Sequence, residues 1–170
     1  MNQVLSHWNL LPPRAAAAEI LACCGSQAWA AGLASQRPYQ DAAALCAASD
    51  RIWLGLSATD WSEAFASHPR IGTARSVGKT SPRSLAWSAR EQRDALRAAD
   101  SVKRALAAAN REYESKFQRV FIICATGKSA TEILENLQRR LNNETSLELQ
   151  EAAEQQRQIT QLRLRKWLAE

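Results

Sequence analysis

Apolar residues recur at steps of three and four along much of the chain, the spacing that places them on one face of an α-helix. The longest series starts at Leu96 and continues through Val102, Leu106 and Phe117. It predicts a helix of about six turns over residues 96–117, with one face buried. Shorter series, and segments rich in helix-forming residues, predict further helices over residues 15–33, 41–56, 61–67, 133–141 and 147–168.

Two segments interrupt this helical pattern. Residues 72–82 are rich in Gly, Ser, Thr, Lys and Arg, which predicts a mobile loop. Residues 120–125 form a short, continuous apolar run that has no second strand to pair with. This run is expected to be an extended or irregular segment in the core, or else the start of the next helix. No linker or repeat divides the chain, so the sequence predicts a single all-α domain over residues 1–170, a multi-helix bundle.

Length and composition narrow the class of protein. The chain has 170 residues, 46% of them hydrophobic, which suffices for one domain with a sizeable core. No apolar run approaches the roughly 20 residues of a membrane span, and the N-terminus lacks the pattern of a secretory signal. The expected compartment is the cytoplasm, with no membrane partner.

Cysteine and histidine usage argues against a metal or redox cofactor. Cys23 and Cys24 are adjacent, whereas Cys46 and Cys124 are isolated, so reduced and buried thiols are expected. With only two histidines and no suitable cysteine spacing, a catalytic transition-metal site is not expected, and no dinucleotide fingerprint is present. Any chemistry should therefore run without a cofactor.

The charge distribution does not point to nucleic acid. The net charge is +5, but 22 basic residues are interspersed with 17 acidic ones, and the most basic stretch, residues 157–166, is interrupted by apolar positions. That pattern is typical of an amphipathic helix, and the positive balance equally suits a small anionic substrate. Gly127-Lys128-Ser129 lacks the earlier glycine of a phosphate-binding loop, because Ile122 stands there. The helix start at this tripeptide could still offer N–H groups to a polar ligand.

The strongest chemical candidate is the pentapeptide His68-Pro69-Arg70-Ile71-Gly72. Pro69 fixes its own φ and disfavours helical geometry at His68, and Gly72 permits a tight turn. A histidine on a rigid turn can be aimed at a ligand, and its ordinary pKa suits proton transfer near neutral pH. A histidine that simply ends the preceding helix is the alternative.

Two further candidates each have a structural alternative. Ser88, Glu91 and Gln92 share a helical face at i, i+3 and i+4 and could meet a ligand beside His68, but Ser-x-x-Glu is also a capping box that would start the long helix. Arg163 could bind a planar, oxygen-rich ligand through its guanidinium. An arginine between two leucines more often covers apolar surface with its stem.

Taken together, these residues resemble the 2-oxo-4-hydroxy-4-carboxy-5-ureidoimidazoline (OHCU) decarboxylases of uric acid degradation. The resemblance extends over nearly the whole chain. The segments that carry it are Cys23-Cys24-Gly25-Ser26 with Trp29, Arg37-Pro38, Asp60-Trp61 with Phe65, His68-Pro69-Arg70-Ile71-Gly72, Ser88 with Glu91-Gln92, Asn110, Tyr113, Phe117, residues 121–129, Arg139, Leu141 and residues 159–164.

The resemblance implies an all-α, cofactor-independent homodimer that converts OHCU, a small ureidoimidazoline, to (S)-allantoin with loss of carbon dioxide. It implies that His68 is the catalytic acid and that Glu91 assists it. The implied substrate-binding residues are Pro69, Ser88, Glu91, Gln92, Phe121, Ile122, Ile123, Cys124, Ala125 and Arg163. The contrasting hypothesis is a non-catalytic helical module that binds an acidic partner.

Overall fold

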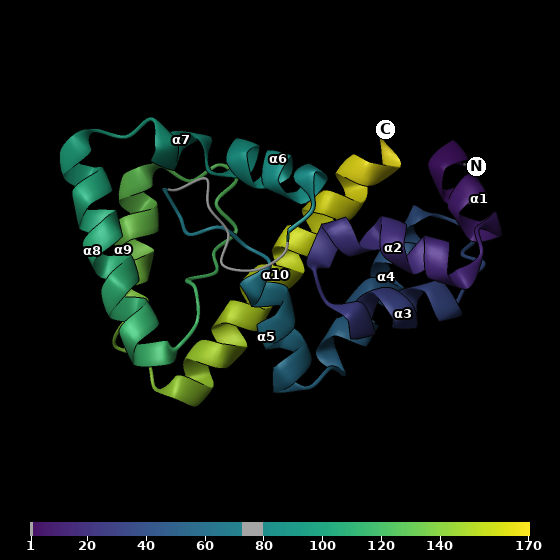
Figure 1. The fold of residues 1–170 in the computed structure, drawn as a ribbon, viewed down its shortest axis with the longest axis horizontal. Coiled ribbons are helices and arrows are strands. Elements are labelled where there is room, and N and C mark those ends of the chain that lie inside the picture. The colour runs from purple at the N-terminus through teal and green to yellow at the C-terminus, as the bar shows by residue number, and fades with distance from the viewer. Residues whose placement is uncertain (1, 73–79) are drawn as a thin grey trace. The chain divides into compact units, whose positions relative to one another are not determined.

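The computed structural model describes residues 2–72 and 80–170. In these residues the chain forms ten α-helices and no β-strand (Figure 1), which confirms the predicted all-α fold. The helices are α1 Gln3–Leu10, α2 Pro13–Cys24, α3 Gln27–Ser35, α4 Ala42–Leu54, α5 Ala58–Ala66, α6 Pro82–Glu91, α7 Arg93–Leu96, α8 Asp100–Phe117, α9 Ala130–Arg140 and α10 Thr145–Leu168. None of the described helices is both long and apolar enough to cross a membrane. Residues 73–79 of the loop predicted over 72–82 lie outside the described residues.

The chain forms two compact units. Unit 1 comprises Met1–Ala64 and Arg157–Glu170, and unit 2 comprises Phe65–Gln156. Helices α5 and α10 contribute residues to both units. The single domain over residues 1–170 stays a prediction, and each unit is described by itself below.

In unit 1, α2 packs against α3 and α3 against α4 (Figure 1). The single helix predicted over residues 15–33 is wrong, because two capping residues divide it. Gly25 ends α2 with a left-handed φ of 84°, and the Ser26 side chain accepts a hydrogen bond from the Trp29 backbone N–H at 3.2 Å to start α3. The α10 part of unit 1 is joined to α4, since Arg157 and Gln161 both donate to Asp50, at 2.9 and 2.8 Å.

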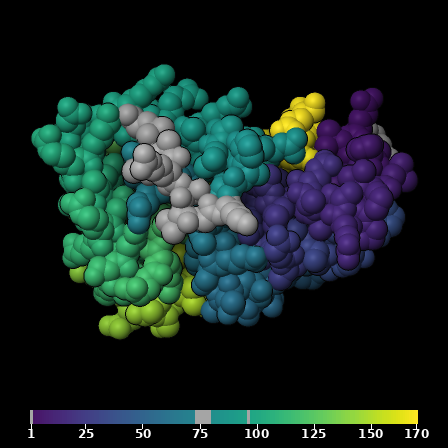
Figure 2. All heavy atoms as spheres, viewed as in Figure 1, coloured from purple at the N-terminus to yellow at the C-terminus, as the bar shows by residue number. Residues whose placement is uncertain are grey.

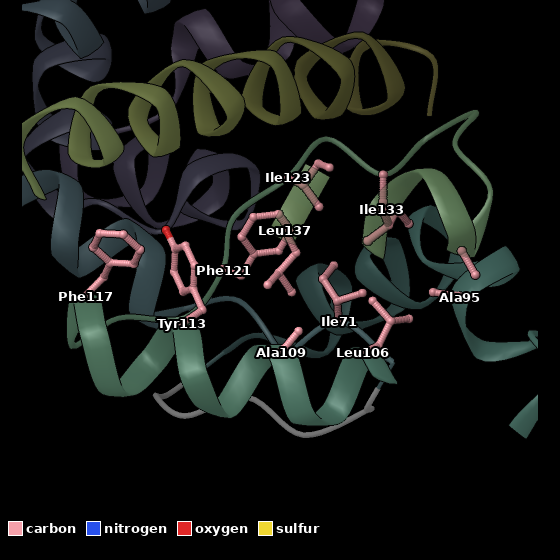
Figure 3. Packing of buried hydrophobic residues seen from close by; sticks show 12 residues of the cluster. Ile71, Ala95, Leu106, Ala109, Tyr113, Phe117, Phe121, Ile123, Ile133 and Leu137 are labelled. Atoms are coloured by element: carbon pink, nitrogen blue, oxygen red, sulfur yellow. The ribbon is translucent and has the colours of Figure 1, made fainter. Parts of the chain in front are cut away.

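The core of unit 2 confirms the buried helix face that the spacing of apolar residues predicts over residues 96–117. Leu106, Tyr113 and Phe117 of α8 are buried, and α9 packs alongside α8 with Ile133 and Leu137 in the same core (Figure 3). Exposed residues cover the outer side of the α8 segment, coloured green in Figure 2. Helix α8 thus has the buried face that its apolar spacing predicted.

The start of this long helix was predicted incorrectly. Helix α8 begins at Asp100, because the residues before it form the separate helices α6 and α7. Ser88 does not cap a helix start but lies inside α6, whose N-cap is Ser81. The Ser81 side chain accepts from the Ser84 N–H at 3.2 Å, and a proline follows at the first helical position, where its missing N–H is not needed.

A capping box does form at the start of α9. The Ser129 hydroxyl accepts from the Glu132 N–H at 3.2 Å, and the Glu132 carboxylate accepts from the Ser129 N–H at 2.7 Å. The Lys128 N–H donates to the Ala125 carbonyl at 3.0 Å. Two N–H groups of Gly127-Lys128-Ser129, those of Lys128 and Ser129, are therefore already bonded within the protein.

Candidate functional site

His68 lies in a buried turn directly after α5. Its side chain is only 6% exposed, and its backbone N–H donates to the Phe65 carbonyl at 3.1 Å. Pro69 is also buried, whereas Arg70 is partly exposed to solvent. We call residues 68–72 the His68 turn. The buried imidazole is therefore held on a backbone whose conformation proline restricts.

Three contacts hold the His68 turn in unit 2. Arg70 forms a bidentate ion pair with Glu114, with N–O distances of 2.5 and 2.7 Å. Asn110 donates from Nδ2 to the Ile71 carbonyl at 3.2 Å. The Gly72 N–H donates to Oε1 of Gln92 at 3.1 Å, and Gly72 adopts a φ of 82°, which favours glycine. The turn is therefore anchored at three successive residues.

The same contact brings the predicted Ser88-Glu91-Gln92 group to the His68 turn. These residues lie at the C-terminal end of α6, where Ser88 and Gln92 are buried and Glu91 is partly buried. Since Oε1 of Gln92 accepts from Gly72, its Nε2 remains as the group that can donate to a ligand. Gln92 thus has the geometry to support the turn and to recognise a carbonyl oxygen.

The predicted irregular segment of residues 120–125 is confirmed, and every one of its residues is buried. Three of its polar backbone groups are bonded to side chains of surrounding helices and loops. The Ile122 carbonyl accepts from Arg140 at 2.6 Å, and the Cys124 N–H donates to Gln155 at 2.9 Å. The Cys124 carbonyl accepts from Lys128 at 2.9 Å. Of the predicted binding residues here, Ile122 and Cys124 therefore use these backbone groups to hold the segment itself.

Ile123, between these two residues, has a different environment. Neither its N–H nor its carbonyl forms a hydrogen bond to any residue that the structure describes. In an extended chain, consecutive residues direct their backbone groups to opposite sides. The Ile123 pair therefore offers one donor and one acceptor to a ligand. Its side chain, 5% exposed, belongs to the core that also contains Ile71 of the His68 turn, Phe121 and Ala125 (Figure 3).

A buried ion pair that the sequence analysis missed supports the 120–125 segment. Arg140 and Glu148 are 1% and 0% exposed, and Arg140 also stacks over the Phe121 ring, 4.5 Å from its centroid. Tyr113 donates its hydroxyl to Glu148, and burial together with this bond raises the pKa of Tyr113 above its ordinary value. One sequence signal could have found the pair, because Arg140 follows Ile133 and Leu137 at helical spacing on the buried face of α9.

Arg163 is in unit 1, where it is almost completely buried in α10. It lies close enough to Cys24 to act on its thiol. Burial raises the pKa of Cys24 to about 12, and hydrogen bonding and the Arg163 charge only partly oppose that shift. A guanidinium this deeply buried is not a surface group that merely covers apolar residues.

Within the described part of the chain, no group of three or more His, Cys, Asp or Glu side chains could hold a metal ion. The titratable groups of the candidate site are instead His68 and Glu91, with Gln92 and Ile123 as hydrogen-bonding groups. Such a set can transfer a proton and bind amide-like atoms of a small ligand.

Comparisons with known proteins agree with this chemistry. The family model described as OHCU decarboxylase matches residues 9–165. The uric acid degradation bifunctional protein TTL of Arabidopsis thaliana is 37% identical over 145 residues, which are 85% of this chain and 44% of that protein. The chain therefore spans less than half the length of this curated relative.

Two solved structures share the fold. One, described as OHCU decarboxylase in the presence of (S)-allantoin, is 31% identical with a TM-score of 0.76, and the match covers 89% of this chain and 98% of that one. The other, described as (S)-allantoin synthase, is 17% identical with a TM-score of 0.71 over 96% of this chain and 53% of that one, and supports the fold alone. The extent of the family match and the identity to these relatives show that the chain belongs to the OHCU decarboxylase family.

Proposed function

We propose that this protein decarboxylates OHCU to (S)-allantoin, with His68 as the proton donor. The observation that carries the proposal is the buried His68 turn, hydrogen-bonded to Gln92 and sharing a core with the 120–125 segment, in a chain that matches the family over residues 9–165. A helical module that binds an acidic partner would need none of these buried polar groups.

The reaction itself needs little from the protein beyond proton transfer and charge stabilisation. The bond between the hydroxyl-bearing ring carbon and the carboxylate breaks, and its electron pair forms a C=C bond to the ring carbon that carries the ureido group, while the π pair of the adjacent C=N bond moves onto the nitrogen. The ring carbon that carries the ureido group then takes up a proton to form the new C–H bond, the hydroxyl loses its proton and becomes a carbonyl, and the ring nitrogen takes up a proton and becomes N–H. Because the substrate supplies its own electron sink, no cofactor is required.

The stereochemistry of the product requires that one face of the new carbon receives the proton. His68, held by Pro69 and its anchored turn, is suited to this delivery. Glu91 orients the imidazole or accepts the proton of the substrate hydroxyl. Gln92 donates from Nε2 to a carbonyl oxygen, and Ile123 pairs its backbone N–H and carbonyl with an amide-like group of the substrate.

Arg163 is proposed to bind a ring or ureido carbonyl oxygen and not the departing carboxylate. The carboxylate loses its charge as it becomes carbon dioxide, so an arginine that grips it would stabilise the ground state more than the transition state. A ring or ureido oxygen keeps or gains negative charge. We further propose that the protein acts as a homodimer, as expected for the family, and that it does so in the cytoplasm.

The test supplies freshly generated OHCU and follows optically active allantoin by circular dichroism. The wild type should exceed spontaneous decay, and His68→Asn should lose about 10²- to 10⁴-fold in kcat, the usual contribution of a general acid. His7→Asn is the matched control, because His7 is the other histidine and lies exposed in α1. In deuterated water, deuterium should enter one face of the new carbon. A racemic product at the enzymatic rate, or an active His68→Asn of unchanged stability, would contradict the proposal.

A further inference from the structure

Asn110 is the most buried of the polar side chains on α8 that contact the His68 turn. It is 4% exposed, and its Nδ2 donates to the Ile71 carbonyl at 3.2 Å. The neighbouring Arg70–Glu114 pair is less enclosed, with side chains 47% and 22% exposed, and exposed ion pairs hold a geometry weakly. Of these two α8 side chains, Asn110 therefore holds the His68 turn more firmly than Glu114 does.

Burying the amide of Asn110 costs free energy of folding. Its Oδ1 is buried and has no hydrogen-bond partner among the residues that the structure describes. A buried amide with half of its polar atoms unsatisfied contributes little to stability. Its neighbours on the same helix, Leu106, Ala109 and Tyr113, are buried in the apolar core. Among the residues that the structure describes, the bond to the Ile71 carbonyl is the hydrogen bond that the Asn110 side chain makes.

The turn also has room to move if that bond is lost. Ile71, Gly72 and Asn110 line a cavity of about 380 Å³ between the turn and α8. Pro69 and Ile71 make the short connection from this bond to His68 stiff, because φ of proline is fixed and the Ile71 side chain is locked in the core. A shift of the Ile71 peptide would consequently be transmitted to the imidazole.

We propose that Asn110 is a positioning residue for His68, acting through the Ile71 carbonyl to aim the imidazole at the substrate. This inference rests on the proposed function of His68 as proton donor. Asn110 does not need to touch the substrate, so its loss should lower the rate of proton delivery and its facial selectivity while leaving substrate affinity nearly unchanged.

The experiment compares Asn110→Leu with the wild type, and uses Asn9→Leu as the matched control. Asn9 likewise donates from Nδ2 to a backbone carbonyl, that of Tyr39 at 2.9 Å, but in unit 1. Asn110→Leu should lower kcat by about 10- to 100-fold with KM within about twofold, as expected for a misplaced catalytic group. The allantoin formed, after subtraction of spontaneous decay, should also lose enantiomeric excess.

A readout that does not depend on turnover separates this inference from the proposed function. The chain has two histidines, so the imidazole resonances of His68 can be followed through a pH titration with His7 as internal reference. Asn110→Leu should change the titration of His68 and not that of His7, and Asn9→Leu should change neither.

If Asn110→Leu does not fold, Asn110→Ala provides the same test, since it removes the donor and adds neither charge nor bulk. An unchanged His68 titration with kcat reduced only in proportion to the folded fraction would overturn the inference. A wild type without activity would instead overturn the proposed function, and the titration would still decide whether Asn110 positions His68.

Discussion

Replacing Arg140 should damage both the stability of the protein and its substrate site. In Arg140→Met the carboxylate of Glu148, which is fully buried, would lose Nε and Nη2 as donors at 3.0 and 2.5 Å. Tyr113 and Asn143 would remain as uncharged donors to that carboxylate. The Ile122 carbonyl would lose its bond of 2.6 Å. The variant therefore leaves one buried charge and one buried carbonyl poorly compensated.

The expected loss follows from the burial of the pair. Removing one partner of a buried ion pair costs about 3–5 kcal/mol, because the remaining charge stays desolvated. The adjacent Arg139 is the matched control, since it pairs with Glu151 at the surface, with side chains 55% and 25% exposed. Arg139→Met should cost about 0–1 kcal/mol. Urea unfolding monitored by circular dichroism, with linear extrapolation, measures both values.

A double variant distinguishes the charge from the position of the backbone. Arg140→Met/Glu148→Gln removes the buried charge but keeps an acceptor for Tyr113, so it should be more stable than Arg140→Met alone. Because the Ile122 carbonyl lacks its donor in both variants, KM for OHCU should stay raised in both. The reasoning is refuted if Arg140→Met loses no more stability than Arg139→Met, or if the double variant restores KM together with stability.

Two other substitutions test single contacts. Gln92→Met removes both the acceptor for the Gly72 N–H and the amide donors without adding a charge, so steady-state kinetics should show a raised KM and the His68 titration should change; a variant that alters only one of the two would contradict a dual role. For Glu132, hydrogen bonds from the Ser129 backbone N–H and hydroxyl lower the pKa below the ordinary 4.5. Its stabilisation is therefore complete above that value and is lost as pH falls through the lowered pKa, so urea midpoints should decline in acid for the wild type more than for Glu132→Gln. Identical acid profiles would show that this carboxylate does not contribute.

The helical periodicity of the sequence predicted which faces are buried but not all the points at which helices begin. The pattern Ser-x-x-Glu occurs at Ser88 and at Ser129, and only the second is a capping box. Ser88 is not at a helix start, because α6 has already begun at Pro82 with Ser81 as its N-cap. A capping box can form only where the preceding residues are not helical, because inside a helix the backbone N–H groups are already bonded. The Ser-x-x-Glu motif alone therefore does not decide where a helix begins.

Candidate site residues could be predicted where a reactive or polar side chain lies next to a local backbone signal in the sequence. His68 and Gln92 became candidates because a proline–glycine turn and a helix-face spacing are visible over a few residues. Asn110 and Arg140 were not assigned roles, because each acts on a backbone carbonyl that is 39 and 18 residues away in sequence. Their only local sign is a polar residue within an otherwise apolar helix face.

That sign has a physical cause in an all-α protein. A candidate site made of irregular backbone, such as the His68 turn and the 120–125 segment, has no neighbouring strand among the described residues to accept and donate its hydrogen bonds. Side chains from the packed helices must do so, as Asn110 does for Ile71 and Arg140 for Ile122. Each of these polar side chains is costly to bury. Each holds a backbone segment of the candidate site in place and does not need to contact the substrate itself. A polar residue on an otherwise apolar helix face consequently indicates, in this fold, a side chain that holds the backbone of the candidate site.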